Sequence, residues 1–219
     1  MDEQHTDLDI LFDRALEYAS LKDVKRSGWV LRGVTDAESV ADHSWGTAQL
    51  CLLFAPWAEQ DPALSGLDRH RAVSMALVHD LAEVEVGDIP RRMASSPARQ
   101  AAKTELESAA IMRLTAPGGT SLQMIHDLWT DYESALSPSA RFVRDMNLVD
   151  MCLQAFIYER DERYDPDSDA EAIPDYPRMS EFFETSRSRC TTFIGMTLHH
   201  MAEERYRELV RSNQENRIS

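Results

Sequence analysis

Two histidines and one aspartate in this sequence could together bind a divalent metal ion. His43 lies in the segment 39–45, and the adjacent pair His79 and Asp80 lies in the apolar segment 76–83. Neutral histidine nitrogens bind divalent transition metals well, and a single carboxylate partly neutralises the charge of such an ion. An unpaired aspartate is costly in an apolar helix. The residue types alone leave two interpretations open, a metal site and a pair of hydrogen-bonded core histidines.

The elements that would position these residues are all predicted to be helices, so the expected fold class is all-α. Apolar residues recur at spacings of three and four in segments 8–19, 72–79 and 142–156, and no segment shows the alternation typical of a strand. Between residues 29 and 34 the chain is expected to be extended or irregular, and residues 165–177 form a polar surface loop. The predicted helices cover approximately 7–19, 39–57, 68–86, 98–114, 121–135, 138–156 and, as one or two helices, 179–211.

Length and composition predict one domain over residues 1–219, with a helical C-terminal extension from about residue 178 and a frayed tail after residue 212. The chain has no apolar run of membrane-spanning length, and its three cysteines show no metal-binding spacing, so a cytoplasmic protein without a membrane partner is expected. The formal net charge of -15 argues against nucleic-acid polymers as partners.

Four short segments carry a family resemblance, namely 38–43, 76–83, 87–90 and 153–155. Together they resemble the HD-domain metal-dependent phosphohydrolase superfamily, in particular the bacterial 5'-deoxynucleotidases and the related human HD-domain-containing protein 2. The similarity covers roughly residues 8–159. It implies an HD-domain helical bundle, often a homodimer, that holds one divalent transition metal (Mn, Co, Fe or Zn). The implied reaction is attack of metal-activated water on a (deoxy)nucleoside 5'-monophosphate or a related small phosphorylated nucleoside.

The same resemblance implies roles for four further residues. Glu83 is expected to act as the acid or base, or to position water, and Asp88 to transfer a proton or hydrogen-bond the substrate. Arg26 and Trp29 are expected to bind the substrate's phosphate and its sugar or base, with Arg32 as a rival to Arg26.

The fourth metal ligand is the position at which the sequence departs from the family pattern. When segment 153–155 is aligned, the place of the family's last metal-binding aspartate falls on Asn147. An amide oxygen can bind a metal but lacks the charge of a carboxylate. Asp150 lies three residues further along, about 60 degrees around a helix, and is the rival fourth ligand.

Two alternatives to the hydrolase remain open. Asn147 is compatible with a catalytically weakened or noncatalytic nucleotide-binding HD protein. A di-iron HD oxygenase would need further histidines between Asp80 and the last acidic ligand, and His126 alone lies in that interval.

Overall fold

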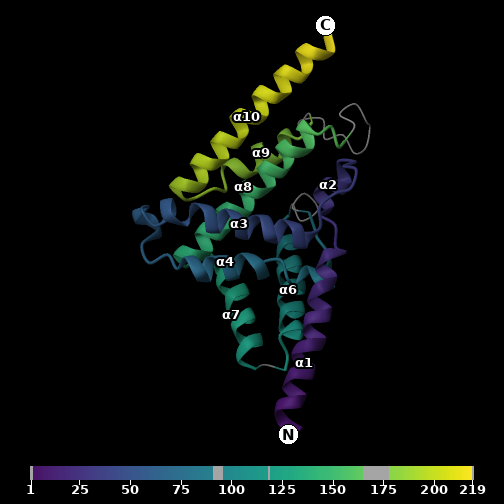
Figure 1. Ribbon diagram of the computed structural model, residues 1–219, viewed down its shortest axis with the longest axis vertical. Coiled ribbons are helices and arrows are strands. Elements are labelled where there is room, and N and C mark those ends of the chain that lie inside the picture. Colours follow the sequence, from purple (N-terminus) through teal and green to yellow (C-terminus); the bar gives the residue numbers. More distant parts are fainter. Residues whose placement is uncertain (1, 91–95, 118, 165–177, 219) are drawn as a thin grey trace.

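The computed structural model describes residues 2–90, 96–117, 119–164 and 178–218, and within these ranges every regular element is a helix (Figure 1). This confirms the all-α prediction. One isolated bridge pairs Lys25 with Ser39. The predicted loop at 165–177 lies outside the described residues. The elements are α1 Asp2–Ala19, η1 Ser20–Lys22, α2 Ser27–Leu31, α3 Val40–Ala58, η2 Pro62–Leu64, α4 Arg69–Val78, α5 Glu83–Val86, α6 Pro97–Leu114, α7 Thr120–Ser134, α8 Pro138–Arg160, α9 Ser180–Arg187 and α10 Phe193–Ile218.

Helix α8 is the centre of the bundle, and α3, α4, α7 and α10 all pack against it. The Ser137 side chain accepts the Ala140 N–H and so caps the helix, and Pro138 suits the first turn because it has no N–H to leave unpaired. The buried core between α3, α4, α7 and α8 is formed largely by apolar side chains that recur at helical spacing. This core fixes the helices that carry the predicted ligands.

Helix α3 begins at a capping box that sets the position of His43. The Ser39 hydroxyl accepts the Asp42 N–H, and the Asp42 carboxylate accepts the Ser39 N–H in return. His43 follows within the first turns, where its imidazole is buried against α8. The capping residues therefore fix the end of α3 that faces the site.

The structure divides the helix that the sequence predicted from residue 68 to residue 86. Helix α4 ends at Val78, a turn carries His79 and Asp80, and the short α5 begins at Glu83. In this turn the N–H of Leu81 donates to Val78 O and the N–H of Glu83 to Asp80 O, the tight i to i+3 pattern. The prediction of one continuous helix from residue 68 to residue 86 is therefore wrong, and Glu83 lies on a different helix from the one that precedes His79.

Two other local predictions concern α2 and the end of the chain. Residues 27–31 form the helix α2, because the Arg26 carbonyl accepts the N–H groups of Trp29 and Val30. The prediction of an extended or irregular chain over residues 29–34 is therefore wrong for residues 29–31, whereas residues 32–34 lie outside any helix or strand. The final helix α10 extends to Ile218, beyond residue 212 where the predicted tail begins.

Candidate metal centre

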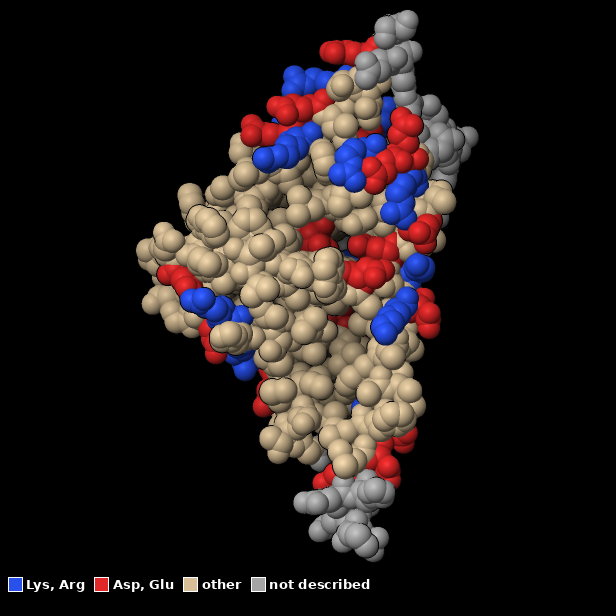
Figure 2. All heavy atoms as spheres, in the orientation of Figure 1, with Lys and Arg blue, Asp and Glu red and all other residues tan. Residues whose placement is uncertain are grey.

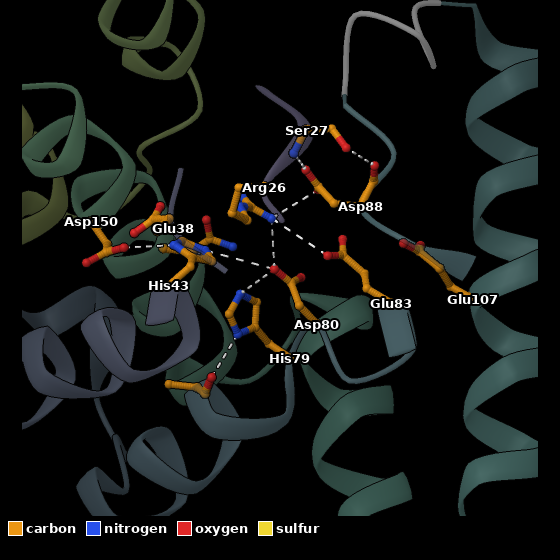
Figure 3. Close-up of polar contacts among 12 residues, drawn as sticks. Arg26, Ser27, Glu38, His43, His79, Asp80, Glu83, Asp88, Glu107 and Asp150 are labelled. Atoms are coloured by element: carbon orange, nitrogen blue, oxygen red, sulfur yellow. Dashed lines mark hydrogen bonds and ion pairs between the residues drawn. The ribbon is translucent and has the colours of Figure 1, made fainter. Parts of the chain in front are cut away.

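His43, His79 and Asp80 meet at the junction of α3 with the turn after α4 (Figure 3). Potential ligand atoms of the three residues all lie within 4.8 Å of one another. Asp80 Oδ2 is 3.2 Å from His79 Nε2 and 3.9 Å from His43 Nε2. Both imidazoles are almost fully buried, whereas Asp80 is partly accessible. The structure thus brings together the three residues singled out by type and spacing.

The hydrogen bonds of the two imidazoles direct the same nitrogen of each ring toward Asp80. His79 Nδ1 donates to Ala76 O at 2.8 Å, and His43 Nδ1 lies 2.7 Å from Asp150 Oδ2. Protonated Nδ1 leaves a lone pair on Nε2, the arrangement in which histidine binds metal. Neither Nε2 has a hydrogen-bond partner among the described residues, although both are buried. Buried polar atoms are rarely left unpaired, so these two nitrogens fit a metal ion between them and Asp80.

Burial and charge also keep His43 neutral, as a ligand must be. Burial lowers the pKa of His43, the Arg26 guanidinium lowers it further, and the Asp150 hydrogen bond only partly opposes both. For Asp80, burial and the neighbouring groups act in opposite directions. Burial raises its pKa, but His79 and Arg26 lower it by more, so Asp80 is ionised.

The two candidates for a fourth ligand lie in different surroundings. Asn147 lines the pocket beside His79 and Asp80, and its Nδ2 donates to the Tyr132 hydroxyl at 2.7 Å. Asp150 instead contacts His43 on the Nδ1 side of the ring, and a second possible cluster joins it to His43 and Glu38. Burial and the nearby Asp150 raise the pKa of Glu38 to about 7.

Arg26 is the cation at the centre of this network. Its Nη1 lies 3.2 Å from both Asp80 Oδ2 and Asp88 Oδ1 and 3.9 Å from Glu83 Oε2. Burial lowers its pKa, but these carboxylates raise it overall, so the guanidinium stays charged. The rival Arg32 is buried in an ion pair with Glu181. Of the two arginines, Arg26 is the one beside the candidate ligands.

Glu83 and Asp88 face Arg26 from α5 and from the segment that follows it. Burial, reinforced by the Asp80 charge, raises the pKa of Glu83 well above its usual value, and Oε2 has no hydrogen-bond partner among the described residues. Gly87 has φ 71°, a conformation that glycine adopts readily, and this turn directs Asp88 back toward α2. There the Asp88 carboxylate accepts the Ser27 N–H.

A pocket of about 250 Å³ opens beside these residues. In Figure 2 acidic side chains gather, with basic ones nearby, around a hollow near the middle of the visible face. The predicted substrate residue Trp29 lines the pocket but is only 2% exposed. Its Nε1 donates to Glu38 Oε1 at 2.8 Å, and its ring packs on Phe182. Trp29 is therefore chiefly a core residue with an edge at the pocket.

The pocket also includes cations that sequence reasoning missed or could not distinguish from surface residues. Lys103 reaches it from α6, and Arg144 reaches it from α8. Arg144 lies one helical turn before Asn147, so helical spacing from that residue could have indicated it. His126, the residue that a di-iron site would need, is not among the pocket-lining residues that the structure describes.

The fold and the site together define an all-helical protein with a candidate divalent-metal centre. A family model described as HD domain matches residues 18–185, so the chain belongs to the HD domain family. This confirms the resemblance carried by the four short segments.

Among curated relatives, the protein named 5'-deoxynucleotidase HDDC2 in Xenopus laevis is 37% identical over 147 residues. The match covers 65% of this chain and 66% of the relative, just under two thirds. The protein of the same name in Danio rerio is 32% identical over 195 residues, covering 86% of this chain and 84% of the relative.

A solved structure, a conserved hypothetical protein from Pyrococcus furiosus, superposes with a TM-score of 0.67 at 27% identity. The match covers 90% of this chain and 99% of the other. Within the described residues, no helix has the length and apolar character needed to cross a membrane.

Proposed function

We propose that this protein is a metal-dependent phosphomonoester hydrolase that acts on deoxynucleoside 5'-monophosphates or a related small phosphorylated nucleoside. The observation that carries the proposal is the pair of buried, unpaired Nε2 atoms of His43 and His79 that face Asp80 beside a pocket. The names of the Xenopus laevis and Danio rerio relatives support the substrate class.

His43, His79 and Asp80 would hold one divalent transition metal, with Mn, Co, Fe and Zn as candidates. Asn147 is the proposed fourth ligand, because it lines the same pocket as His79 and Asp80. When bound, such an ion polarises a phosphoryl oxygen and lowers the pKa of a coordinated water. The sequence alternative of Asp150 as fourth ligand is the competing assignment.

Other side chains supply charge and proton transfer. Arg26 and Lys103 give the pocket positive charge for a phosphate, although the chain as a whole is acidic. Glu83, with its raised pKa, carries a proton that it can donate to the 5'-oxygen as the phosphorus–oxygen bond breaks. Asp88 orients Arg26, and the edge of Trp29 that lines the pocket contacts the sugar or base.

The direct test is phosphate release from a panel of ribo- and deoxynucleoside 5'-monophosphates with Mn²⁺, Co²⁺, Fe²⁺ or Zn²⁺. We expect release with at least one metal and none after chelation. A 3'-monophosphate panel is the matched control for regiospecificity. A protein that binds metal but releases no phosphate from any member of the panel would contradict the proposed activity.

Asn147 favours one second candidate, a weakened or noncatalytic nucleotide-binding protein, because an amide binds a metal less strongly than a carboxylate. If Asn147 is the fourth ligand, Asn147→Asp should tighten metal binding about tenfold, within the range that a favourable charged contact supplies. Chelator competition measures this change. Nucleotide binding in calorimetry without phosphate release in either protein would favour the noncatalytic candidate.

We also propose a cytoplasmic homodimer. The exposed face of α3 carries the large apolar side chains Trp45, Leu52, Leu53 and Trp57, an arrangement typical of an interaction surface. In Figure 2 the part of the surface over α3 shows few charged residues. The three free, buried cysteines suit a reducing compartment. Sedimentation equilibrium of the wild type and of Trp57→Glu tests the dimer.

A further inference from the structure

We propose that Asp150 is not a metal ligand but the residue that orients His43 for metal binding, and that Gly46 exists as glycine to admit its carboxylate. The inference rests on the proposed metal-dependent function and assigns one step of it, the preparation of His43.

The position of Asp150 relative to the imidazole carries the first part. Asp150 Oδ2 lies 2.7 Å from His43 Nδ1, whereas Asp80 Oδ2 faces Nε2 on the opposite side of the ring (Figure 3). A carboxylate that accepts the Nδ1 proton fixes the ring rotation and the tautomer, and leaves Nε2 as the free donor atom. Because Asp150 accepts this hydrogen bond from His43, it acts on the metal through the imidazole and not by direct contact.

His79 provides an internal comparison. Its Nδ1 donates to a backbone carbonyl, Ala76 O, which carries no full charge. Of the two imidazoles, His43 alone has a carboxylate at Nδ1, and that carboxylate makes Nε2 a stronger electron-pair donor than a neutral acceptor would. Asn147 lacks the negative charge of the aspartate that the family pattern has at this position. Asp150, one helical turn further along α8, partly replaces that charge through its hydrogen bond with His43.

Gly46 carries the second part, independently of the metal. A Cβ placed on Gly46 would lie 2.1 Å from Asp150 Oδ1 and 2.9 Å from Asp150 Cγ, far inside any permitted contact. The three closest atoms to that Cβ all belong to Asp150. Glycine is costly inside a helix, so its presence in the middle of α3 has a packing reason. The reason is the carboxylate of Asp150.

The test is a double-mutant cycle on metal affinity, with Mn²⁺ or Co²⁺ titrated against a chelator. Asp150→Ala should raise the metal Kd about 10–100-fold, the usual range for loss of a ligand's outer hydrogen bond. Gly46→Ala should raise it similarly, because the new methyl group displaces the carboxylate. Once Asp150 is alanine, Gly46→Ala should change the Kd less than about threefold, because the clash is gone.

Two controls separate orientation from charge and from folding. Glu38 lies beside Asp150, but its carboxyl group accepts a hydrogen bond from Trp29 and makes none with His43. Glu38→Gln should therefore change the metal Kd less than about threefold. Thermal unfolding of each apoprotein reports whether the variant folds. Asp150→Asn, which keeps an acceptor for Nδ1–H without the charge, should fall between wild type and Asp150→Ala.

Three outcomes would overturn the inference: unchanged affinity in Asp150→Ala, strictly additive effects of the two substitutions, or an effect of Glu38→Gln as large as that of Asp150→Ala. A fourth outcome would also overturn it. If Asp150→Ala lost metal binding as completely as Asp80→Ala, while Asn147→Ala kept the wild-type affinity, Asp150 would be a direct ligand. Because the readout is metal affinity, a protein that follows the cycle yet releases no phosphate would contradict only the proposed activity.

Discussion

Among the residues that the structure describes, two buried polar clusters contain histidine, and they differ in how their atoms are paired. At the end of α9 and in α10, His199 Nε2 lies 2.8 Å from Ser186 Oγ and 3.1 Å from Phe183 O, and His199 Nδ1 lies 3.9 Å from Glu203 Oε2. Beside α3, His43 Nε2 and His79 Nε2 are equally buried but make no hydrogen bond among the described residues, and the carboxylate they both face, Asp80 Oδ2, lies 3.9 and 3.2 Å away. By residue type alone, the first cluster has the serine, histidine and glutamate of a hydrolytic triad.

The difference in pairing separates a structural cluster from a functional one. The Ser186 hydroxyl is fully buried and donates to Phe182 O at 2.6 Å, so it is satisfied within α9 and closed to substrate. The unpaired nitrogens of His43 and His79 lie beside a pocket and are incomplete without a further group. Polar atoms left unsatisfied at a pocket identify the site here better than the residue types do.

The largest effect is expected at the unpaired cluster. Asp80→Ala removes the carboxylate shared by both imidazoles and should abolish metal binding and turnover, a loss greater than the about 100-fold that an outer hydrogen bond can supply. Metal content of the purified protein and phosphate release measure it. Asp127→Asn, an exposed aspartate on α7, is the matched control, and phosphate release by Asp80→Ala at the wild-type rate is the result that would count against the site.

Arg26→Ala should separate substrate binding from metal binding at the same cluster. A hydrogen bond to a charged group is worth about 1.5–3 kcal/mol, so kcat/KM should fall roughly 10–100-fold. The metal Kd should not rise, because Arg26 is a cation beside Asp80 and its removal takes away charge that repels the metal ion. Arg26→Lys, which keeps the charge, should recover part of the loss, and a variant that loses its metal would mean that Arg26 mainly supports the ligands.

At the paired cluster the expected effect is on stability. His199→Ala leaves the buried Ser186 hydroxyl without one partner and opens space between α9 and α10, so the free energy of unfolding should fall by about 1–3 kcal/mol. Urea unfolding measures this change. The metal Kd should stay as in the wild type, and a loss of metal affinity would show that the two clusters are coupled.

The smallest effect is the pH dependence of that stability. Burial lowers the pKa of His199, partly opposed by Glu203, and Arg187 lowers it further. The unfolded chain therefore takes up the proton first, and stability is lost as the pH falls below about 6.5 toward the lower folded pKa. Urea unfolding between pH 7 and pH 5 should show a smaller loss in His199→Gln than in wild type. Equal losses would mean that other groups, such as His43, account for the dependence.

The sequence predicted most of the fold because the long helices have strong apolar periodicity and clear caps. Ser137 with Pro138, for example, marks the start of α8, where the structure has it. The short elements were missed because backbone hydrogen bonds decide them. The helix α2 and the turn between α4 and α5 depend on the Arg26, Val78 and Asp80 carbonyls, which no side-chain pattern reveals.

The site could be predicted only as far as residue type and local spacing reach. The types and spacing of His43, His79 and Asp80 indicate a metal site, the family resemblance indicates Arg26, and the structure brings these residues together. The hydrogen bond from His43 to Asp150 joins residues 107 positions apart, and the clearance at Gly46 exists only once α3 and α8 are packed. Contacts of this kind follow from tertiary packing and leave no local signal in the sequence.

The most direct test of the account is a crystal structure of the protein with Mn²⁺ or Zn²⁺, in which anomalous scattering locates the ion. We expect one ion within about 2.0–2.2 Å of His43 Nε2, His79 Nε2 and an Asp80 oxygen, with Asp150 still on His43 Nδ1. An ion held by Glu38 and Asp150, or none at His43 and His79 under saturating metal, would contradict the claim that these unpaired nitrogens form a metal centre.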